Sequence, residues 1–83
     1  MQQNYIMVLN LTQLKSGQSG TIIEIQGGLG LTRHLESMGV RLGKKITKTS
    51  AQFWQGPQTI KVGNLQIAIG FGMARRILIE VEK

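Results

Sequence analysis

The sequence predicts a mainly β fold, a small barrel of about five strands with a helical insert that caps one end. Three observations lead to this prediction. Short β-branched or alternating segments recur along the chain, eleven glycines against a single proline indicate tight turns, and one helical stripe interrupts the series. An open five-stranded sheet would leave unpaired backbone donors at both edges, so closure into a barrel is favoured.

One domain accounts for the whole chain. We expect residues 1–8 to form a flexible leader and residues 9–83 to form the domain, with either Met1 or Met7 as the true start. A chain of 83 residues buries only about two-thirds of its unfolded surface, so the core must be small. No apolar run approaches the roughly 20 residues of a membrane span, and the N-terminus lacks the order of a signal peptide.

The helical insert covers residues 31–38. Leu31, Leu35 and Met38 recur at the spacing of one helix face, which predicts that this stripe packs on the β-rich remainder. Gly39 follows directly, and glycine enters the left-handed conformation after a helix without a Cβ clash. If Gly39 adopts it, Val40 folds back on Leu35, so this segment is a hinge from helix to strand.

The expected strands are residues 21–25, 44–52, 58–62, 65–69 and 77–82, and residues 71–76 form a bend or a single helical turn. Gly63 and Asn64 have the two-residue spacing of a tight hairpin. A glycine-rich segment, residues 27–30, forms the bend from the first strand into the helix. The residues expected to point inward are Ile46, Ile60, Val62, Leu65, Ile67, Ile69, Ile77, Ile79 and Val81.

The composition argues against an enzyme and against a metal or cofactor site. The chain has one histidine, no aspartate and no cysteine, so neither a catalytic triad nor a thiolate metal site can be assembled. His34 lies at the edge of the apolar stripe. We interpret it as a half-buried histidine bonded to a backbone group, because a metal needs three or four convergent donors and only Glu36 is near in sequence.

A net charge of +6 indicates an acidic partner, either a protein, a lipid headgroup surface or a nucleic acid. Basic residues gather along the hinge, at Arg33, Arg41, Lys44, Lys45 and Lys48. They form either an ordinary solvated surface or a docking face.

Phe53 and Trp54 are adjacent in the loop that follows the strand begun at Lys44. They either fold over the barrel as a lid on the core or protrude as an anchor, since tryptophan is enriched at binding hot spots. Nucleic-acid binders of this size usually carry aromatics on strand faces, so a loop position favours a protein partner. The partner-binding residues that we expect are Arg33, Arg41, Lys44, Lys45, Phe53 and Trp54.

The order of these motifs resembles the FeoA family, the ferrous iron transport protein A family. The most specific stretch is Arg33-x-Leu35-x-x-Met38-Gly39-Val40. The other matching residues are Leu11, Thr12, Leu14, Gly17, Gly20, Gly43, Ile46, Gly56, Pro57, Val62, Gly63, Leu65, Ile67, Ala68, Ile69, Ala74, Ile77 and Ile79. The chain departs from the family pattern at Leu42, at Lys48 with Thr49, and over residues 70–72.

The resemblance implies an SH3-like barrel, a cytoplasmic location at the inner face of the membrane, and action as an accessory of the ferrous iron transporter FeoB of bacteria and archaea. That partner carries a cytoplasmic GTP-binding domain. Similar barrels form the C-terminal domain of iron-dependent repressors, so the alternative is a nucleic-acid-binding or regulatory module. The resemblance leaves open whether the protein stimulates GTP hydrolysis or only assembles the transporter, and in which oligomeric state.

Overall fold

The computed structural model describes residues 6–49 and 56–82. Six strands, two α-helices and one 3₁₀ turn follow one another along these residues. In chain order they are β1 (Ile6–Asn10), η1 (Leu11–Gln13), β2 (Ser19–Ile25), α1 (Leu29–Ser37), β3 (Lys45–Lys48), β4 (Gln58–Val62), β5 (Leu65–Ile69), α2 (Phe71–Ala74) and β6 (Ile77–Glu82).

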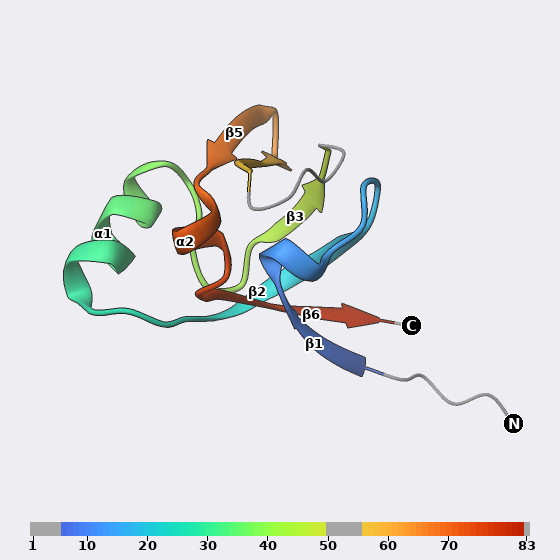
Figure 1. Cartoon of the computed structure of the whole chain (residues 1–83), viewed down its shortest axis with the longest axis horizontal. Coiled ribbons are helices and arrows are strands. Elements are labelled where there is room, and N and C mark those ends of the chain that lie inside the picture. Colours follow the sequence, from blue (N-terminus) through green and yellow to red (C-terminus); the bar gives the residue numbers. More distant parts are fainter. Residues whose placement is uncertain (1–5, 50–55, 83) are drawn as a thin grey trace, which may run out of the picture.

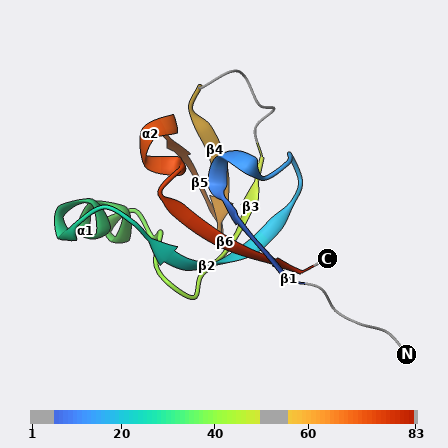
Figure 2. The same cartoon turned by 60° about the horizontal axis from the view of Figure 1, so that its bottom comes forward.

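The strands form one antiparallel sheet in the order β1-β6-β2-β3-β4-β5, and the sheet curls around a single core (Figure 1). A bulge between Ile22 and Glu24 shifts the register of β2 against β6. Helix α1 lies at the end of the barrel opposite the start of β1 and the end of β6 (Figure 2). The predicted mainly β barrel with a helical insert is therefore confirmed, with six strands instead of about five.

The additional strand is β1. The sequence predicts a leader over residues 1–8, whereas Ile6, Met7 and Val8 pair with β6. These residues are all apolar, so they show no alternation. In the structure they do alternate in burial, because Ile6 is 60% exposed and Val8 is 52% exposed, while Met7 between them is half-buried. An edge strand with apolar residues on both faces cannot be recognised from periodicity alone.

The core lies between the inner faces of the strands and is closed by residues of η1, α1 and α2. The expected inward positions on β4 and β6 are confirmed. Leu65 is an exception, since it is 61% exposed although Val62 directly opposite is only 6% exposed. Leu65 begins the edge strand β5 directly after the Gly63–Asn64 turn, whereas Ile69 at the other end of β5 is fully buried. The buried apolar residues are Leu11, Leu14, Ile22, Leu35, Val40, Ile46, Ile60, Val62, Ile69, Ala74, Ile77, Ile79 and Val81.

The hinge after α1 has the predicted geometry. Gly39 has φ +92°, in the left-handed region. The amide of Gly39 donates to the carbonyl of Glu36 at 3.0 Å, and the amide of Val40 donates to the carbonyl of Leu35 at 2.9 Å. This pair of bonds is the Schellman arrangement at a helix end. It brings Val40 back against Leu35, and both side chains are fully buried.

Candidate partner-binding surface

Four of the residues that the sequence assigns to partner binding are exposed and spread over the helix and the hinge. Arg33 lies on α1, Arg41 follows the Gly39 turn, Lys44 directly precedes β3, and Lys45 is the first residue of β3. Lys44 and Lys45 line one common hollow of the surface, which neither arginine lines. Phe53 and Trp54 lie outside the described residues, so their assignment remains a prediction.

Lys48 does not belong to this surface. Its side chain is fully buried, and its Nζ donates to the carbonyls of Leu11 and Thr12 at 3.3 and 3.5 Å. The Leu11 carbonyl also accepts from the Leu14 amide at 3.3 Å, so Lys48 is its second donor. Burial lowers the pKa of Lys48, since the interior disfavours the charged form. Lys48 is two residues after buried Ile46, so the strand period places both on the inner face.

His34 is not half-buried as the sequence suggests. Its side chain is exposed, and its own carbonyl accepts a hydrogen bond from the Ser37 hydroxyl at 2.6 Å. Of the apolar stripe on α1 only Leu35 is fully buried, whereas Leu31 and Met38 are half-buried, so the edge of the stripe faces solvent. Across residues 6–49 and 56–82, no three His, Cys, Asp or Glu side chains gather as a metal site would require.

The outer face of β2, β3 and β4 carries hydroxyl groups and lysines at alternate positions. Ser19 on β2 lies opposite Thr47 on β3, and Thr47 lies opposite Lys61 on β4. The hydroxyls of Ser19 and Thr47 are 2.7 Å apart and share a hydrogen bond. Lys45 lies opposite Thr21 in the neighbouring row. Their neighbours along the strands, Ile22, Ile46 and Ile60, are buried in the core, so these outer residues lie on the opposite face of the sheet, outside the core.

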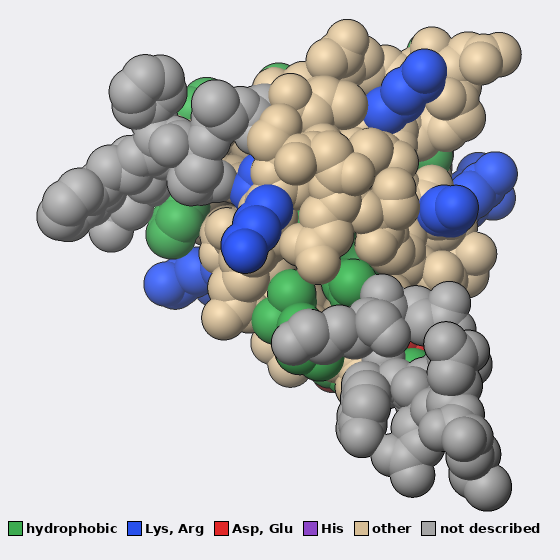
Figure 3. All heavy atoms as spheres, turned by 90° about the vertical axis from the view of Figure 1, so that its right-hand side faces the viewer, with side chains coloured by type: hydrophobic (Ala, Val, Ile, Leu, Met, Phe, Trp, Pro, Cys, Tyr) green, Lys and Arg blue, Asp and Glu red, His purple; other side chains and the backbone are tan. Residues whose placement is uncertain are grey.

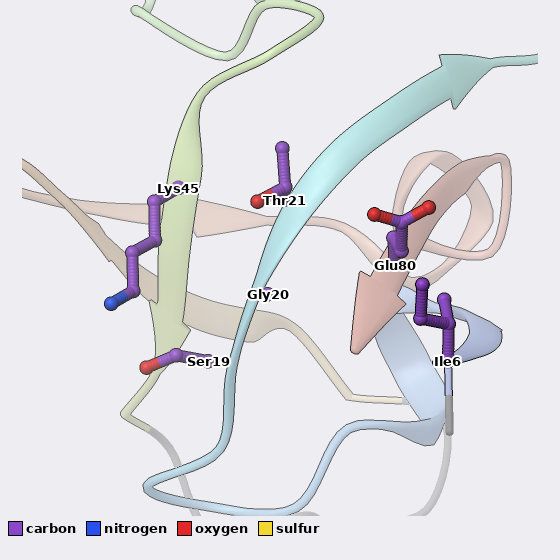
Figure 4. A pocket seen from close by; sticks show the side chains of 6 residues that line it. All are labelled: Ile6, Ser19, Gly20, Thr21, Lys45 and Glu80. Carbon is purple, nitrogen blue, oxygen red and sulfur yellow. The ribbon is translucent and has the colours of Figure 1, made fainter. Parts of the chain in front are cut away.

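This face is hollowed in two places. One hollow of about 390 Å³ lies over β2, where Thr21 and Gly20 separate Lys45 on β3 from Glu80 on β6 (Figure 4). The other measures about 490 Å³ and lies over β3 and β4. Lys45 lines both hollows. The first is lined by Ile6, Ser19, Gly20, Thr21, Lys45 and Glu80, and the second by Lys44, Lys45, Thr47, Lys61 and Gly63.

Gly20 allows β2 to lie closely over β6 beneath the first hollow. A Cβ at this position would overlap the Ile79 side chain and lie 2.8 Å from the Glu80 carbonyl oxygen. Only a residue without a side chain fits there, because the close approach of two backbones leaves no room. Sequence inspection finds this glycine but not its role, since the atoms it would meet are about 60 residues away along the chain.

Lysine and arginine dominate the charged surface of the molecule. On the face shown in Figure 3, basic side chains are spread among polar side chains and backbone, and almost no acidic surface is visible over the described atoms.

The sequence does not predict three of the residues that line the hollows, namely Ser19, Thr47 and Lys61. Their alternation with buried Ile60 and Ile46 is the signal that places them on the outer face.

Comparisons with known proteins agree with this architecture. The family model described as the FeoA domain matches residues 9–81. The chain belongs to the FeoA family. A protein of Methanocaldococcus jannaschii named "Putative Fe(2+) transport protein A" is 35% identical over 66 residues, which cover 80% of this chain and 78% of that protein.

Solved FeoA structures share the fold. The crystal structure of an iron uptake regulatory protein, FeoA, superimposes with a TM-score of 0.84 at 32% identity and covers 93% of this chain and 100% of that one. A manganese-dependent transcriptional repressor gives a TM-score of 0.82 at 17% identity over 93% of this chain and 43% of its own, which shows the fold alone. The predicted SH3-like barrel of the FeoA family is thus confirmed.

No helix of this FeoA-family chain, within the described residues, has the length and apolar character to cross a membrane. The longest, α1, has nine residues.

Proposed function

We propose that this FeoA-family protein is a small cytoplasmic accessory of ferrous iron uptake, which binds the cytoplasmic side of the transporter FeoB and supports or regulates its activity. Membership of the family supports the link to Fe(2+) transport, since a relative is named for that process. The protein acts by binding and not by catalysis, because its composition offers no catalytic constellation.

The observation that carries the docking role is the pair of exposed lysines at the start of β3. Lys44 and Lys45 line a hollow together with Lys61, and none of the described residues that line it is acidic. Such a surface attracts an acidic protein partner and speeds its association. We propose that the docking face comprises Arg33, Arg41, Lys44, Lys45, Phe53 and Trp54, with the basic residues steering the partner and Trp54 holding it.

A pull-down with the cytoplasmic domain of FeoB, with and without guanine nucleotide, tests this function. We expect the wild-type protein to be retained and the Lys44→Glu, Lys45→Glu variant to be lost. The matched control is Lys15→Glu with Arg75→Glu, which makes the same charge change at two exposed residues outside the hollow and should be retained. Equal loss of both variants, or no retention of the wild type, contradicts the proposal.

Measuring GTP hydrolysis in the complex with the FeoB domain shows whether the protein stimulates the transporter's GTPase or only assembles the transporter. If it stimulates GTP hydrolysis, an arginine supplied to the nucleotide site is the available means, and Arg33 and Arg41 are both exposed. The rate of GTP hydrolysis should then rise on adding the protein and fall back with Arg33→Lys or Arg41→Lys. If it only assembles the transporter, the rate stays unchanged while binding persists.

The alternative function is nucleic-acid binding, and the salt dependence of binding distinguishes it from docking to FeoB. Binding that neutralises several phosphates weakens steeply with salt. Retention on duplex DNA with such a slope, in the absence of retention by FeoB, would favour the alternative. The likeness to the repressor supports only the shared fold.

A further inference from the structure

We propose that the two hollows form one groove across the outer face of β6, β2, β3 and β4, and that this groove receives an extended acidic segment of a protein partner. The inference rests on the proposed docking function and adds to it the shape and the charge order of the segment. The groove consists of the two joined hollows, which have Lys45 in common.

The groove has charges of opposite sign at its two ends. Lys44, Lys45 and Lys61 surround the hollow over β3 and β4. Glu80 on β6 lines the other hollow, beside the exposed side chain of Ile6 (Figure 4). A bound chain should therefore place its carboxylates over the lysines, and a basic or hydroxyl side chain beside Glu80.

The residues between the two ends of the groove can form hydrogen bonds with the backbone of a bound peptide. Thr21, Ser19 and Thr47 present hydroxyl groups that both donate and accept hydrogen bonds, and they are small enough to leave the surface concave. The side chains on this floor make no contribution to the core, since each alternates with a buried residue such as Ile22 or Ile46.

The length of the groove matches a short extended peptide. Strand β6 and strand β4 are separated by β2 and β3, which makes three strand spacings of about 4.8 Å, or roughly 14 Å in total. An extended chain advances about 3.3 Å per residue, so about four or five residues cross the groove.

The shape and composition favour a peptide over the other acidic partners. An anionic membrane surface is broad, and where it met Lys45 it would also meet Glu80, which lines the same hollow and repels it. A nucleic acid carries a negative charge along its whole length, so it would be repelled at Glu80.

An NMR titration of the full ¹⁵N-labelled chain tests the inference. The probes are two synthetic pentapeptides, Glu-Glu-Glu-Ser-Lys and Glu-Glu-Glu-Ser-Glu, each with blocked ends. We expect saturable amide shifts confined to β2, β3, β4 and β6, with tighter binding of the peptide that ends in lysine. Shifts that scatter over the surface, or that never saturate, overturn the proposal.

Variants separate specific recognition from general charge attraction. Lys45→Gln with Lys61→Gln should weaken binding about fivefold, while the matched control Lys15→Gln with Arg75→Gln should change it less than about twofold. Glu80→Gln should abolish the preference for the lysine-ending peptide by improving the affinity of the other. Equal losses in both double variants, or an unchanged preference in Glu80→Gln, contradict the groove. Spectra of the free variants show directly whether they are folded.

Two further probes identify the partner class. Vesicles with about one-third phosphatidylserine and a single-stranded oligothymidine are titrated under the same conditions. Binding of either one with larger shifts on the same residues than the peptides overturns the assignment to a protein segment. If the peptides bind as expected but the FeoB domain does not, the groove stands and the proposed transporter partner is wrong. If the domain binds through Lys44 and Lys45 but its binding is unchanged by Lys61→Gln and by Glu80→Gln, the proposed function stands and the groove is wrong.

Discussion

Lys45 and Lys48 lie three residues apart on β3 and have opposite environments. Lys45 is exposed and lines both hollows of the outer face, whereas Lys48 is fully buried and donates to carbonyls of η1. The strand period alone accounts for the difference, since Ile46 and Lys48 point inward while Lys45 and Thr47 point outward. Position along the strand thus decides which lysine is buried, although both side chains are charged.

The two surfaces of the barrel differ in the same way as these two lysines. The inner face depends on close contacts, so substitutions there should cost stability. On the outer face, Lys44, Lys45 and Lys61 are exposed and lie outside the core, so substitutions of these lysines should change binding and leave stability nearly unchanged. The following predictions test this separation.

The largest effect is expected at Gly20, where β2 lies closest to β6. Gly20→Ala places a methyl group against Ile79 and the Glu80 carbonyl, so the strands must separate. We expect a loss of about 3 kcal/mol in the free energy of unfolding, measured by urea denaturation. The control is Gly30→Ala in α1, where a Cβ meets no atom within 4 Å and helix propensity favours alanine. Equal midpoints for both variants would show that the close approach is not rigid.

Trp54 tests whether the aromatic loop belongs to the interior or to the docking face. If Trp54 is an anchor, Trp54→Ala should speed dissociation from the FeoB cytoplasmic domain and cost about 2 kcal/mol of binding free energy. Surface-plasmon kinetics and a thermal melt of the same sample decide between the two assignments. A lowered melting midpoint with an unchanged dissociation rate would place Trp54 in the core.

Gly39→Ala should cost about 1 kcal/mol, because alanine at φ +92° is strained. No neighbouring atom lies within 4 Å of the added Cβ, so any loss reports the backbone and not a clash. Gly39→Asn is the matched variant and should lose less, since asparagine tolerates the left-handed region. If thermal melts show the two variants to be equal, conformational strain is not the cause.

The smallest effect is expected from Lys48, as a dependence of the free energy of unfolding on pH. Burial lowers its pKa below the ordinary value of 10.5, so the folded protein holds this proton less tightly than the unfolded chain. Stability should therefore rise as pH increases through the folded-state pKa towards 10.5. Relative to Lys48→Met, the wild type should gain stability over this range in urea denaturation. A constant difference between the two proteins would mean that Lys48 keeps its ordinary pKa when folded.

Local patterns in the sequence predict much of this fold. The glycine after Met38 indicates the hinge, the alternation after Gln58 indicates a hairpin, and the final strand follows the same rule. These features depend on neighbours along the chain, which a sequence displays directly. The character of individual side chains misleads at Lys48, which is polar yet buried, and at Leu65, which is apolar yet exposed.

The surface is predicted less completely than the fold. The lysines at the start of β3 are correctly placed outside, but Lys61 and Glu80 reach the same face from strands distant in sequence. Which outer residues meet is decided by strand order and register. Both follow from long-range pairing, such as Thr21 with Glu80, that no local pattern reveals.

The association rate of the Lys44→Glu, Lys45→Glu variant with the FeoB cytoplasmic domain tests the central claim most directly. We expect surface-plasmon measurements to show association slowed about tenfold at low salt, a weaker dependence on salt, and a dissociation rate and melting midpoint close to those of the wild type. An unchanged association rate, or a loss of stability that accounts for all of the lost binding, would contradict the claim that the outer face of β3 serves docking and not the fold.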